Sequence, residues 1–175
     1  MEALVYGGAA SGKSRYAEDL LCALSGEGPR IYLATMEAMD EESRARVRRH
    51  RALRQNKGFS TLECPRDLGG LTIPVGSSVL LEDLGNLLSN EIWSPAGAGE
   101  QAETAILSGI NAILNRAALL VVVSNEIFSD GAEWTDDMAR YVQSLGRLHQ
   151  ALADRAETVV EVVCGIPVYH KRGGR

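Results

Sequence analysis

The feature that most constrains this chain is the segment Gly7-Gly-Ala-Ala-Ser-Gly-Lys-Ser14, which follows a short apolar run and precedes a stretch of helical character. It fits the pattern G-x-x-x-x-G-K-[ST], a phosphate-binding loop between a β-strand and an α-helix. In such a loop the backbone N–H groups converge on phosphate oxygens at the N-terminus of the helix. The complete match and its flanks favour a nucleoside triphosphate site over a glycine-rich turn that binds nothing.

Two side chains of this loop have predicted roles in catalysis. Lys13 is expected to reach the β- and γ-phosphates, and the Ser14 hydroxyl to ligate Mg²⁺. An acidic partner for the metal should end a neighbouring strand, at the edge of the sheet where α/β proteins bind ligands. Glu82 and Glu126 are both candidates, since each follows a strand-like apolar run. For either acid, a helix cap or a solvated loop carboxylate is the alternative.

Strand-like and helix-like segments alternate along the chain, which predicts an α/β fold with a mostly parallel central sheet and helices on both faces. The 175 residues suit one domain over residues 1–170, followed by a flexible tail at 171–175. Strands are expected at residues 3–6, 30–35, 59–63, 77–82, 118–124 and 158–163, and helices at 14–24, 40–55, 100–116 and 135–153. The unbroken apolar run at 118–124 predicts a central strand that is covered on both faces.

The charge balance narrows the classes of partner. The chain has 18 Lys and Arg against 23 Asp and Glu, a net charge of −5, which argues against a general nucleic-acid or anionic-membrane binder. No apolar run approaches the roughly 18 residues that span a bilayer. The 3 cysteines are far apart and outside any C-x-x-C spacing, so they predict a cytoplasmic protein without a disulfide framework or a zinc site.

An arginine-rich segment surrounds one of the 3 histidines. With helical spacing, Arg46 and Arg54 lie four residues on either side of His50, on the same face of the expected helix. A neutral imidazole among guanidinium groups is suited to attack the α-phosphate of a nucleotide. From spacing alone, however, a solvated basic face with an incidental His50 is favoured. His149 is expected to be a packing or surface residue, and His170 to lie in the tail.

Taken together, the motifs resemble a known family. They are the phosphate loop, Tyr-Leu-Ala-Thr35 at the end of the second strand, Arg-Arg-His50-Arg, and Leu-Leu-Glu82 before Leu-Ser-Asn90, followed by Ser-Asn125-Glu126 and the late Gly146-Arg-Leu-x-Gln150. In this order they resemble the bifunctional adenosylcobinamide kinase/adenosylcobinamide-phosphate guanylyltransferase family of cobalamin synthesis, over nearly the whole chain.

The resemblance implies two reactions on a corrinoid substrate, with GTP, ATP and Mg²⁺ as nucleotides and metal. The chain would phosphorylate the aminopropanol hydroxyl of adenosylcobinamide, and then pass GMP from GTP through His50 to the product, giving adenosylcobinamide-GDP. It also implies a RecA-like P-loop fold and a homotrimer. Catalytic roles fall on His50 and Lys13, and Mg²⁺ ligation on Ser14 and Glu82. The implied nucleotide-binding residues are Gly7, Gly8, Ala9, Ala10, Ser11, Gly12, Lys13, Ser14, Thr35, Met36, Glu37, Arg51, Ala52, Leu53, Arg54, Glu63 and Glu82.

The sequence departs from the family pattern at Ala10, where a basic residue is common, in the loop at 127–131, and at Gln143 and His149. None of these positions is His50, so the departures bear on the kinase reaction and the corrinoid contacts more than on guanylyl transfer. Two alternatives therefore stay open: a guanylyltransferase that has lost the kinase activity, and a small-molecule P-loop kinase without a covalent step.

Overall fold

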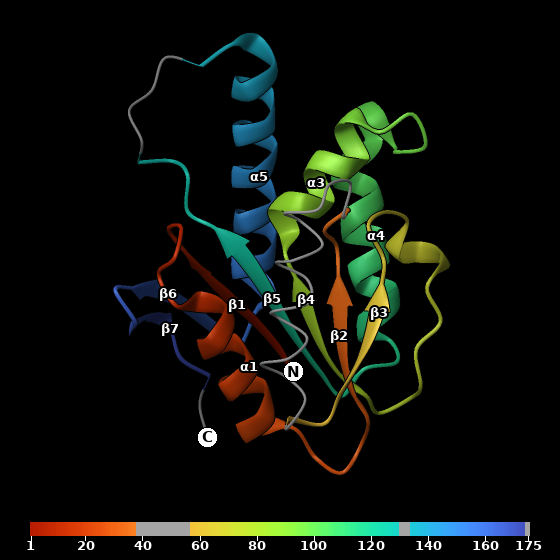
Figure 1. Ribbon diagram of the computed structural model, residues 1–175, viewed down its shortest axis with the longest axis vertical. Helices are drawn as coiled ribbons and strands as arrows, with labels where there is room; N and C mark the ends of the chain where they lie inside the picture. The colour runs from red at the N-terminus through yellow and green to blue at the C-terminus, as the bar shows by residue number, and fades with distance from the viewer. Residues whose placement is uncertain (38–56, 130–133, 174–175) are drawn as a thin grey trace.

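The computed structural model describes residues 1–37, 57–129 and 134–173. These residues form a seven-stranded sheet with helices on both of its faces (Figure 1), as the sequence predicts. The expected helix at 40–55, with His50 and its arginines, lies outside the described residues. None of the described helices has both the length and the apolar character that a membrane crossing requires.

The sheet has the strand order β3-β2-β4-β5-β1-β6-β7. Neighbouring strands are parallel from β3 to β6, and only β7 runs antiparallel to its neighbour β6. The central strand β5 is buried along almost its whole length, which confirms the expectation from its apolar run. The strands are β1 (Glu2–Gly7), β2 (Arg30–Ala34), β3 (Phe59–Glu63), β4 (Ser78–Glu82), β5 (Leu119–Asn125), β6 (Thr158–Val163) and β7 (Ile166–Lys171).

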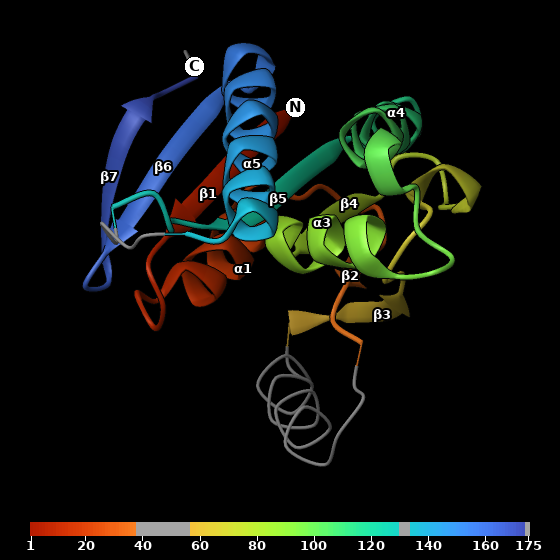
Figure 2. The ribbon, with the colours of Figure 1, turned by 90° about the horizontal axis from the view of Figure 1, so that it is seen from above.

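The helices cover the two faces of the sheet unequally (Figure 2). Helix α1 (Lys13–Leu24) packs Ala17 and Leu21 on one face, against valines of β1 and β5. Helices α3 (Leu84–Trp93), α4 (Ala102–Leu114) and α5 (Asp136–Arg155) pack on the other face, where Leu4 and Val122 belong to the same buried cluster. Two short 3₁₀ turns, η2 (Leu68–Gly70) and η3 (Gly99–Gln101), complete the described elements.

One α-helix and one strand of the structure were absent from the sequence prediction. One is helix α3, whose N-cap residue Asp83 accepts a side-chain hydrogen bond of 2.7 Å from the N–H of Asn86. The other is strand β7, which extends to Lys171 and therefore contains His170, a residue that was expected in a tail. In addition, the first turn expected for the helix at 100–116 is instead the 3₁₀ turn η3.

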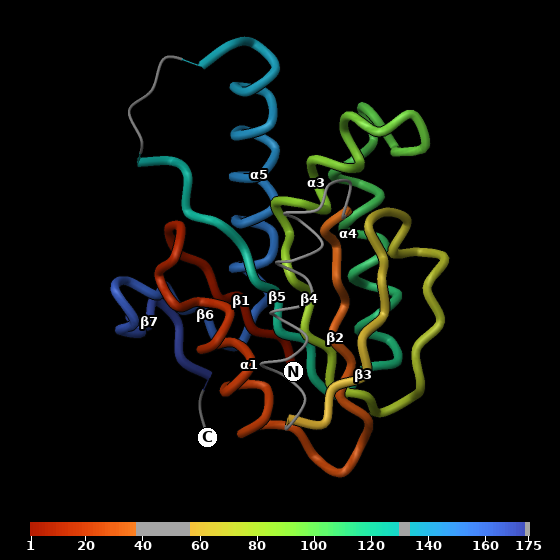
Figure 3. The backbone as a smooth tube through the Cα atoms, in the orientation of Figure 1, coloured from red at the N-terminus to blue at the C-terminus, as the bar shows by residue number. Residues whose placement is uncertain are grey.

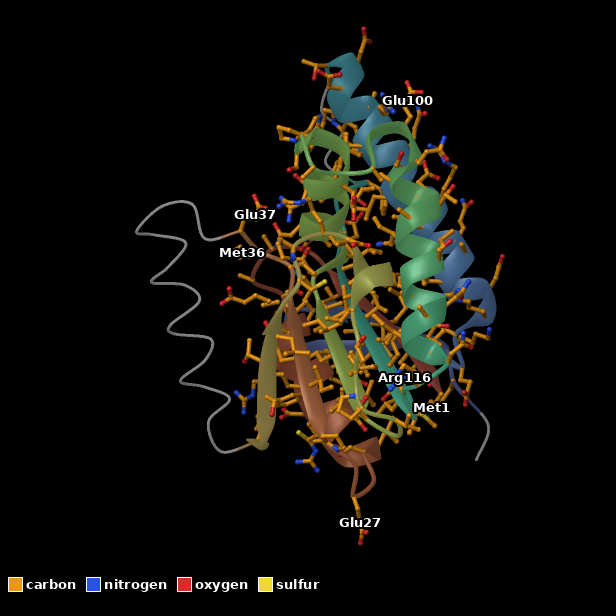
Figure 4. The ribbon with its side chains drawn as sticks, turned by 90° about the vertical axis from the view of Figure 1, so that its right-hand side faces the viewer. Met1, Glu27, Met36, Glu37, Glu100 and Arg116 are labelled. Atoms are coloured by element: carbon orange, nitrogen blue, oxygen red, sulfur yellow. The ribbon has the colours of Figure 1, made fainter. Side chains whose placement is uncertain are left out.

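The parallel strands bring their carboxyl ends to one edge of the sheet. Gly7 at the end of β1 pairs in register with Asn125 at the end of β5, and β5 lies between β1 and β4. Figure 4 shows Met36 and Glu37 at this carboxyl edge, with Met1 and Arg116 at the opposite edge. The connection from β3 to β4 returns the chain to that opposite edge along the outside of the sheet (Figure 3). The carboxyl edge thus gathers most of the predicted site residues.

Candidate active site

The phosphate loop links β1 to α1 at the carboxyl edge, where the sequence predicts it. Gly12 is the N-cap of α1 and has a left-handed backbone, with φ 91° and ψ 4°. No side chain caps this end of the helix, and its first turn contains no acidic residue. The N–H groups at a helix start lack partners inside the helix, so they form a site for an anion.

The loop is held closely by the neighbouring strands. A Cβ atom on Gly7 would lie 2.4 Å from the carbonyl oxygen of Val162 and 2.7 Å from Ser11 Oγ, so only glycine fits. The carbonyl oxygen of Ser11 accepts a hydrogen bond of 2.8 Å from the N–H of Gly165, in the turn between β6 and β7. Ala10 has a positive φ of 55°, a backbone region that disfavours residues with a Cβ. The loop conformation therefore depends on contacts from the far end of the chain.

Lys13 and Ser14 lie at the base of this loop, beside Glu82 at the end of β4. Lys13 is buried, and its Nζ donates a hydrogen bond of 3.1 Å to the carbonyl oxygen of Gly8. The Ser14 hydroxyl donates a hydrogen bond to Glu82 Oε1. The other carboxylate oxygen, Oε2, is buried and has no hydrogen-bond partner among the described residues. The structure thus brings together both sequence-predicted metal ligands.

The environment of Glu82 disfavours its charged form. Burial raises the pKa of Glu82 to about 7, and the neighbouring carboxylate of Asp83 contributes in the same direction. The Ser14 hydrogen bond and the charge of Lys13 act against this rise without cancelling it. A buried carboxylate with one unpartnered oxygen suits a cation, because the cation replaces the interactions that burial removed.

The described residues offer Mg²⁺ few protein ligands. Across residues 1–37, 57–129 and 134–173 there is no cluster of three or more His, Cys, Asp or Glu side chains that could hold a metal. Mg²⁺ in nucleotide sites is bound by one or two protein oxygens, with phosphate and water oxygens filling the remaining positions. The donor set of Ser14 Oγ and the Glu82 carboxylate fits that arrangement.

Thr35 is buried behind the site and connects two strand ends. Its backbone N–H donates to the carbonyl oxygen of Glu82 at 3.0 Å. Its hydroxyl donates to the carbonyl oxygen of Asp83 at 2.8 Å and accepts from the Asp83 N–H at 2.7 Å. Asn90 on α3 donates to the carbonyl oxygens of Thr35, at 2.8 Å, and of Pro65, at 3.0 Å. Thr35 therefore positions the Glu82–Asp83 backbone in addition to its predicted place in the nucleotide site.

The other predicted nucleotide-binding residues of the described chain lie along the same edge. Met36 and Glu37 follow β2, and Glu37 forms an ion pair with Arg66. Glu63, which is exposed, ends β3 in register with Ala34, as Glu82 does on the other side of β2. At about 4.8 Å per strand, two intervening strand spacings put these two glutamates about 10 Å apart at the backbone. His50, Arg51, Ala52, Leu53 and Arg54 lie outside the described residues.

Glu126, the second candidate for a metal-binding acid, accepts hydrogen bonds from residues of its own loop. Its Oε1 accepts hydrogen bonds from the N–H of Phe128 at 2.9 Å, and from the N–H and the hydroxyl of Ser129 at 3.2 and 3.1 Å. The preceding residue, Asn125, instead directs its side chain to the carboxylate of Asp83. Asn125 and Asp83 are thus site residues to which the sequence analysis gave no role.

His149 and His170 lie on either side of Tyr6. The Nε2 atom of His149 is 2.6 Å from Ser124 Oγ, and the ring centroids of His149 and Tyr6 are 5.6 Å apart. Burial lowers the pKa of His149 to about 4, so the ring is neutral at neutral pH. His170 pairs with Glu161 at 3.1 Å and stacks on Tyr6. His149 is therefore a packing residue, as expected.

This chain is similar to known proteins over nearly its whole length. The family model for cobinamide kinase / cobinamide phosphate guanyltransferase matches residues 3–169. The bifunctional adenosylcobalamin biosynthesis protein CobU of Salmonella typhimurium is 34% identical over 184 residues, which cover 96% of this chain and 98% of that protein. The bifunctional adenosylcobalamin biosynthesis protein CobP of Pseudomonas aeruginosa is 35% identical over 173 residues, 96% of each chain.

A solved structure supports the fold alone. It is an ATPase domain that superposes with a TM-score of 0.53 at 9% identity, over 91% of this chain and 68% of that one. The P-loop architecture expected from the resemblance is therefore correct. With a match over nearly all of its length, this chain belongs to the cobinamide kinase / cobinamide phosphate guanyltransferase family.

Proposed function

We propose that this chain is a bifunctional enzyme of cobalamin biosynthesis, which phosphorylates adenosylcobinamide and then transfers GMP from GTP to the phosphorylated product. The names of the relatives support the pathway and a bifunctional protein, and the description of the matching family supports the two activities. The observation that carries the proposal is the Ser14–Glu82 pair beneath the phosphate loop, with one buried carboxylate oxygen unpartnered in the described chain. This pair, together with Lys13, forms a site suited to a nucleoside triphosphate with its metal.

In the kinase reaction, the loop binds the triphosphate through its backbone N–H groups and Lys13. Lys13 exchanges the Gly8 carbonyl for the β- and γ-phosphates. Ser14 and Glu82 would hold Mg²⁺, which when bound neutralises phosphate charge. The substrate hydroxyl oxygen then forms a bond to the γ-phosphorus while the bond to the β–γ bridging oxygen breaks. The nucleoside diphosphate leaves, and the hydroxyl proton is released to solvent.

In the guanylyl transfer, the proposed nucleophile is His50, on the strength of the motif that surrounds it. A ring nitrogen forms a bond to the α-phosphorus of GTP as the α–β bridging bond breaks, and pyrophosphate leaves. A phosphate oxygen of the phosphorylated cobinamide then attacks the same phosphorus, and the N–P bond breaks. The surrounding arginines, including Arg51 and Arg54, supply the positive charge for binding and for the developing negative charge.

Retention of the kinase activity is part of the proposal. The departures from the family pattern left open a guanylyltransferase that has lost the kinase activity. The phosphate loop, however, keeps its left-handed Gly12, its buried Lys13 and the contact from Ser14 to Glu82. Each of these features serves triphosphate binding, so their presence together supports a working kinase.

The test is labelling with α-³²P GTP and Mg²⁺. Wild type is expected to retain an acid-labile, base-stable label that His50→Ala loses and His170→Ala, an exposed histidine paired with Glu161, keeps. Adenosylcobinamide phosphate should remove the label as product forms. Wild type that binds GTP but takes up no label would contradict the covalent step and favour a simple P-loop kinase. A γ-labelled nucleotide tests the kinase half separately.

The resemblance also implies a homotrimer in the cytoplasm, which we include in the proposal. Sedimentation velocity of the purified protein tests the assembly directly. A species of three times the 18.8 kDa chain mass is expected, and a monomer at all concentrations would contradict it.

A further inference from the structure

An exposed tryptophan and a half-buried tyrosine form an aromatic pair beside the carboxyl edge of the sheet. Trp93, the last residue of α3, stacks on Tyr141 of α5, with ring centroids 5.4 Å apart and planes 25° from parallel. Trp93 is 49% exposed. Met138, which is 43% exposed, lies three residues before Tyr141 and so on the same side of α5. We call Trp93, Tyr141 and Met138 the Trp93 surface.

The Trp93 surface is joined to the phosphate site through Tyr141. The Tyr141 hydroxyl donates a hydrogen bond of 3.2 Å to the carbonyl oxygen of Gly85. A Cβ atom on Gly85 would lie 2.9 Å from this hydroxyl oxygen, 3.1 Å from Asn125 Nδ2 and 3.2 Å from Asp83 Oδ1. Three polar groups from different elements therefore converge at one glycine. Asp83 directly follows Glu82, so these contacts form a continuous path to Ser14 and the phosphate loop.

The protonation state of Tyr141 is consistent with its place in this path. Burial, with a contribution from the charge of Asp83, raises the pKa of Tyr141 to about 12, so the phenol is neutral and donates its proton. The hydroxyl end of the Tyr141 side chain is thus held beside Gly85, Asn125 and Asp83, while its ring stacks on Trp93. A side chain with a polar end inside and an aromatic body outside is typical of a ligand wall.

We propose that the Trp93 surface binds the corrin ring of the substrate, with the aminopropanol arm directed along α3 towards the phosphate loop. This inference rests on the proposed function. A corrin is a broad, nearly flat conjugated ring with methyl groups at its edge, and aromatic and methionine side chains pack well on such a face. A contiguous exposed apolar patch that is rimmed by polar groups is typical of a ligand or interaction site.

The dimensions of the arm and of α3 are compatible. α3 rises about 12 Å between Gly85 and Trp93, at about 1.5 Å per residue. The chain that joins the corrin ring to its terminal hydroxyl contains seven bonds and extends about 9 Å at ordinary bond lengths and angles. A ring that rests against Trp93 therefore presents its hydroxyl near the Asp83 end of the helix, next to Glu82, which contacts Ser14 of the phosphate loop.

The experiment measures adenosylcobinamide binding by equilibrium dialysis, read from the visible absorbance of the corrinoid. This readout does not depend on which transfer reaction the protein catalyses. Trp93→Ala is expected to raise the dissociation constant roughly tenfold, the size of one lost aromatic contact, and Trp93→Phe to restore most of it. Val75→Ala is the matched control, because Val75 is 74% exposed and adjoins Gly76, which bonds Arg116 at the opposite edge.

GTP affinity should be unchanged in every variant, which also reports that each one is folded. If Trp93→Ala does not fold, Met138→Ala tests the same surface and is expected to weaken corrinoid binding severalfold. Wild-type corrinoid affinity in these variants refutes the inference, as does an equal loss of GTP affinity. Wild-type protein that binds no adenosylcobinamide instead overturns the proposed function.

Discussion

Glu82 gives the sharpest quantitative prediction, because its burial links stability to pH. Glu82→Gln replaces the carboxyl group with a neutral group of nearly the same shape, which still accepts the Ser14 hydrogen bond through its oxygen. The variant therefore resembles wild type with Glu82 protonated. The two proteins should differ only where wild-type Glu82 is ionised.

The magnitude follows from the pKa of Glu82, which rises from 4.5 to about 7 in the folded chain. The folded chain keeps this proton up to a higher pH than the unfolded chain does. The stability that protonated Glu82 provides is therefore complete below pH 4.5 and is lost as the pH rises through 7. At about 1.4 kcal/mol per pKa unit, the loss amounts to about 3 kcal/mol. Glu82→Gln should thus match wild type near pH 4.5 and exceed its free energy of unfolding by about 3 kcal/mol near pH 8.

Urea unfolding of both proteins without nucleotide or metal, at several pH values between 4.5 and 8, measures this difference. Glu27→Gln is the control, because Glu27 is an exposed glutamate at the opposite edge of the sheet (Figure 4). A difference in the free energy of unfolding between Glu82→Gln and wild type that is the same at every pH would refute the reasoning. It would show that Glu82 has the same pKa in the folded and the unfolded chain.

Three further predictions concern the phosphate loop and His149. Lys13→Ala should lose roughly ten- to a hundredfold in GTP affinity by calorimetry, as expected for charged hydrogen bonds, and unaltered affinity would contradict the phosphate-loop assignment. Gly7→Ala should lower the free energy of unfolding by about 1–3 kcal/mol, because its Cβ would meet the Val162 carbonyl, whereas Gly8→Ala, with open space, should cost far less. The depressed pKa of His149, about 4 against 6.5, means that wild type loses stability as the pH falls from 6.5 towards 4, and His149→Gln should remove part of that acid sensitivity in urea titrations. Equal acid sensitivity in both proteins would show that His149 is protonated alike when folded and unfolded.

Local patterns were sufficient to predict most of the strands. The strand at Phe59–Glu63 was predicted with the bounds that the structure shows, since turn residues flank it on both sides. Helix α3 was missed, although Asp83 as an N-cap and the apolar spacing after it were available signals. Strand β7 was missed for a physical reason: it is an exposed edge strand that contains Pro167, so it lacks the alternating pattern of a half-buried strand.

The site was predictable only in its components. The motif identified Lys13 and Ser14, and the family resemblance favoured Glu82 over Glu126, but neither predicted the contact between Ser14 and Glu82. Ser14 and Glu82 are 68 residues apart, and their contact exists because β4 ends at the same edge as the phosphate loop. The loop around Glu126 occupies that carboxylate through short-range hydrogen bonds. Residue spacing alone predicts neither the Ser14–Glu82 contact nor the hydrogen bonds that Glu126 accepts.

The position of β1 in the sheet has a consequence for the order in which the protein acquires its function during synthesis. The phosphate loop leaves the ribosome early, yet β1 pairs only with β5 and β6, and Ser11 receives its hydrogen bond from Gly165. A nascent chain that stops short of these residues has the complete motif but lacks the two strands that flank β1 and the contact from Gly165. Because such long-range pairing must precede binding, nucleotide cannot assist the folding of the first half of the chain. Affinity for GTP should therefore appear late and abruptly along a series of ribosome-bound truncations.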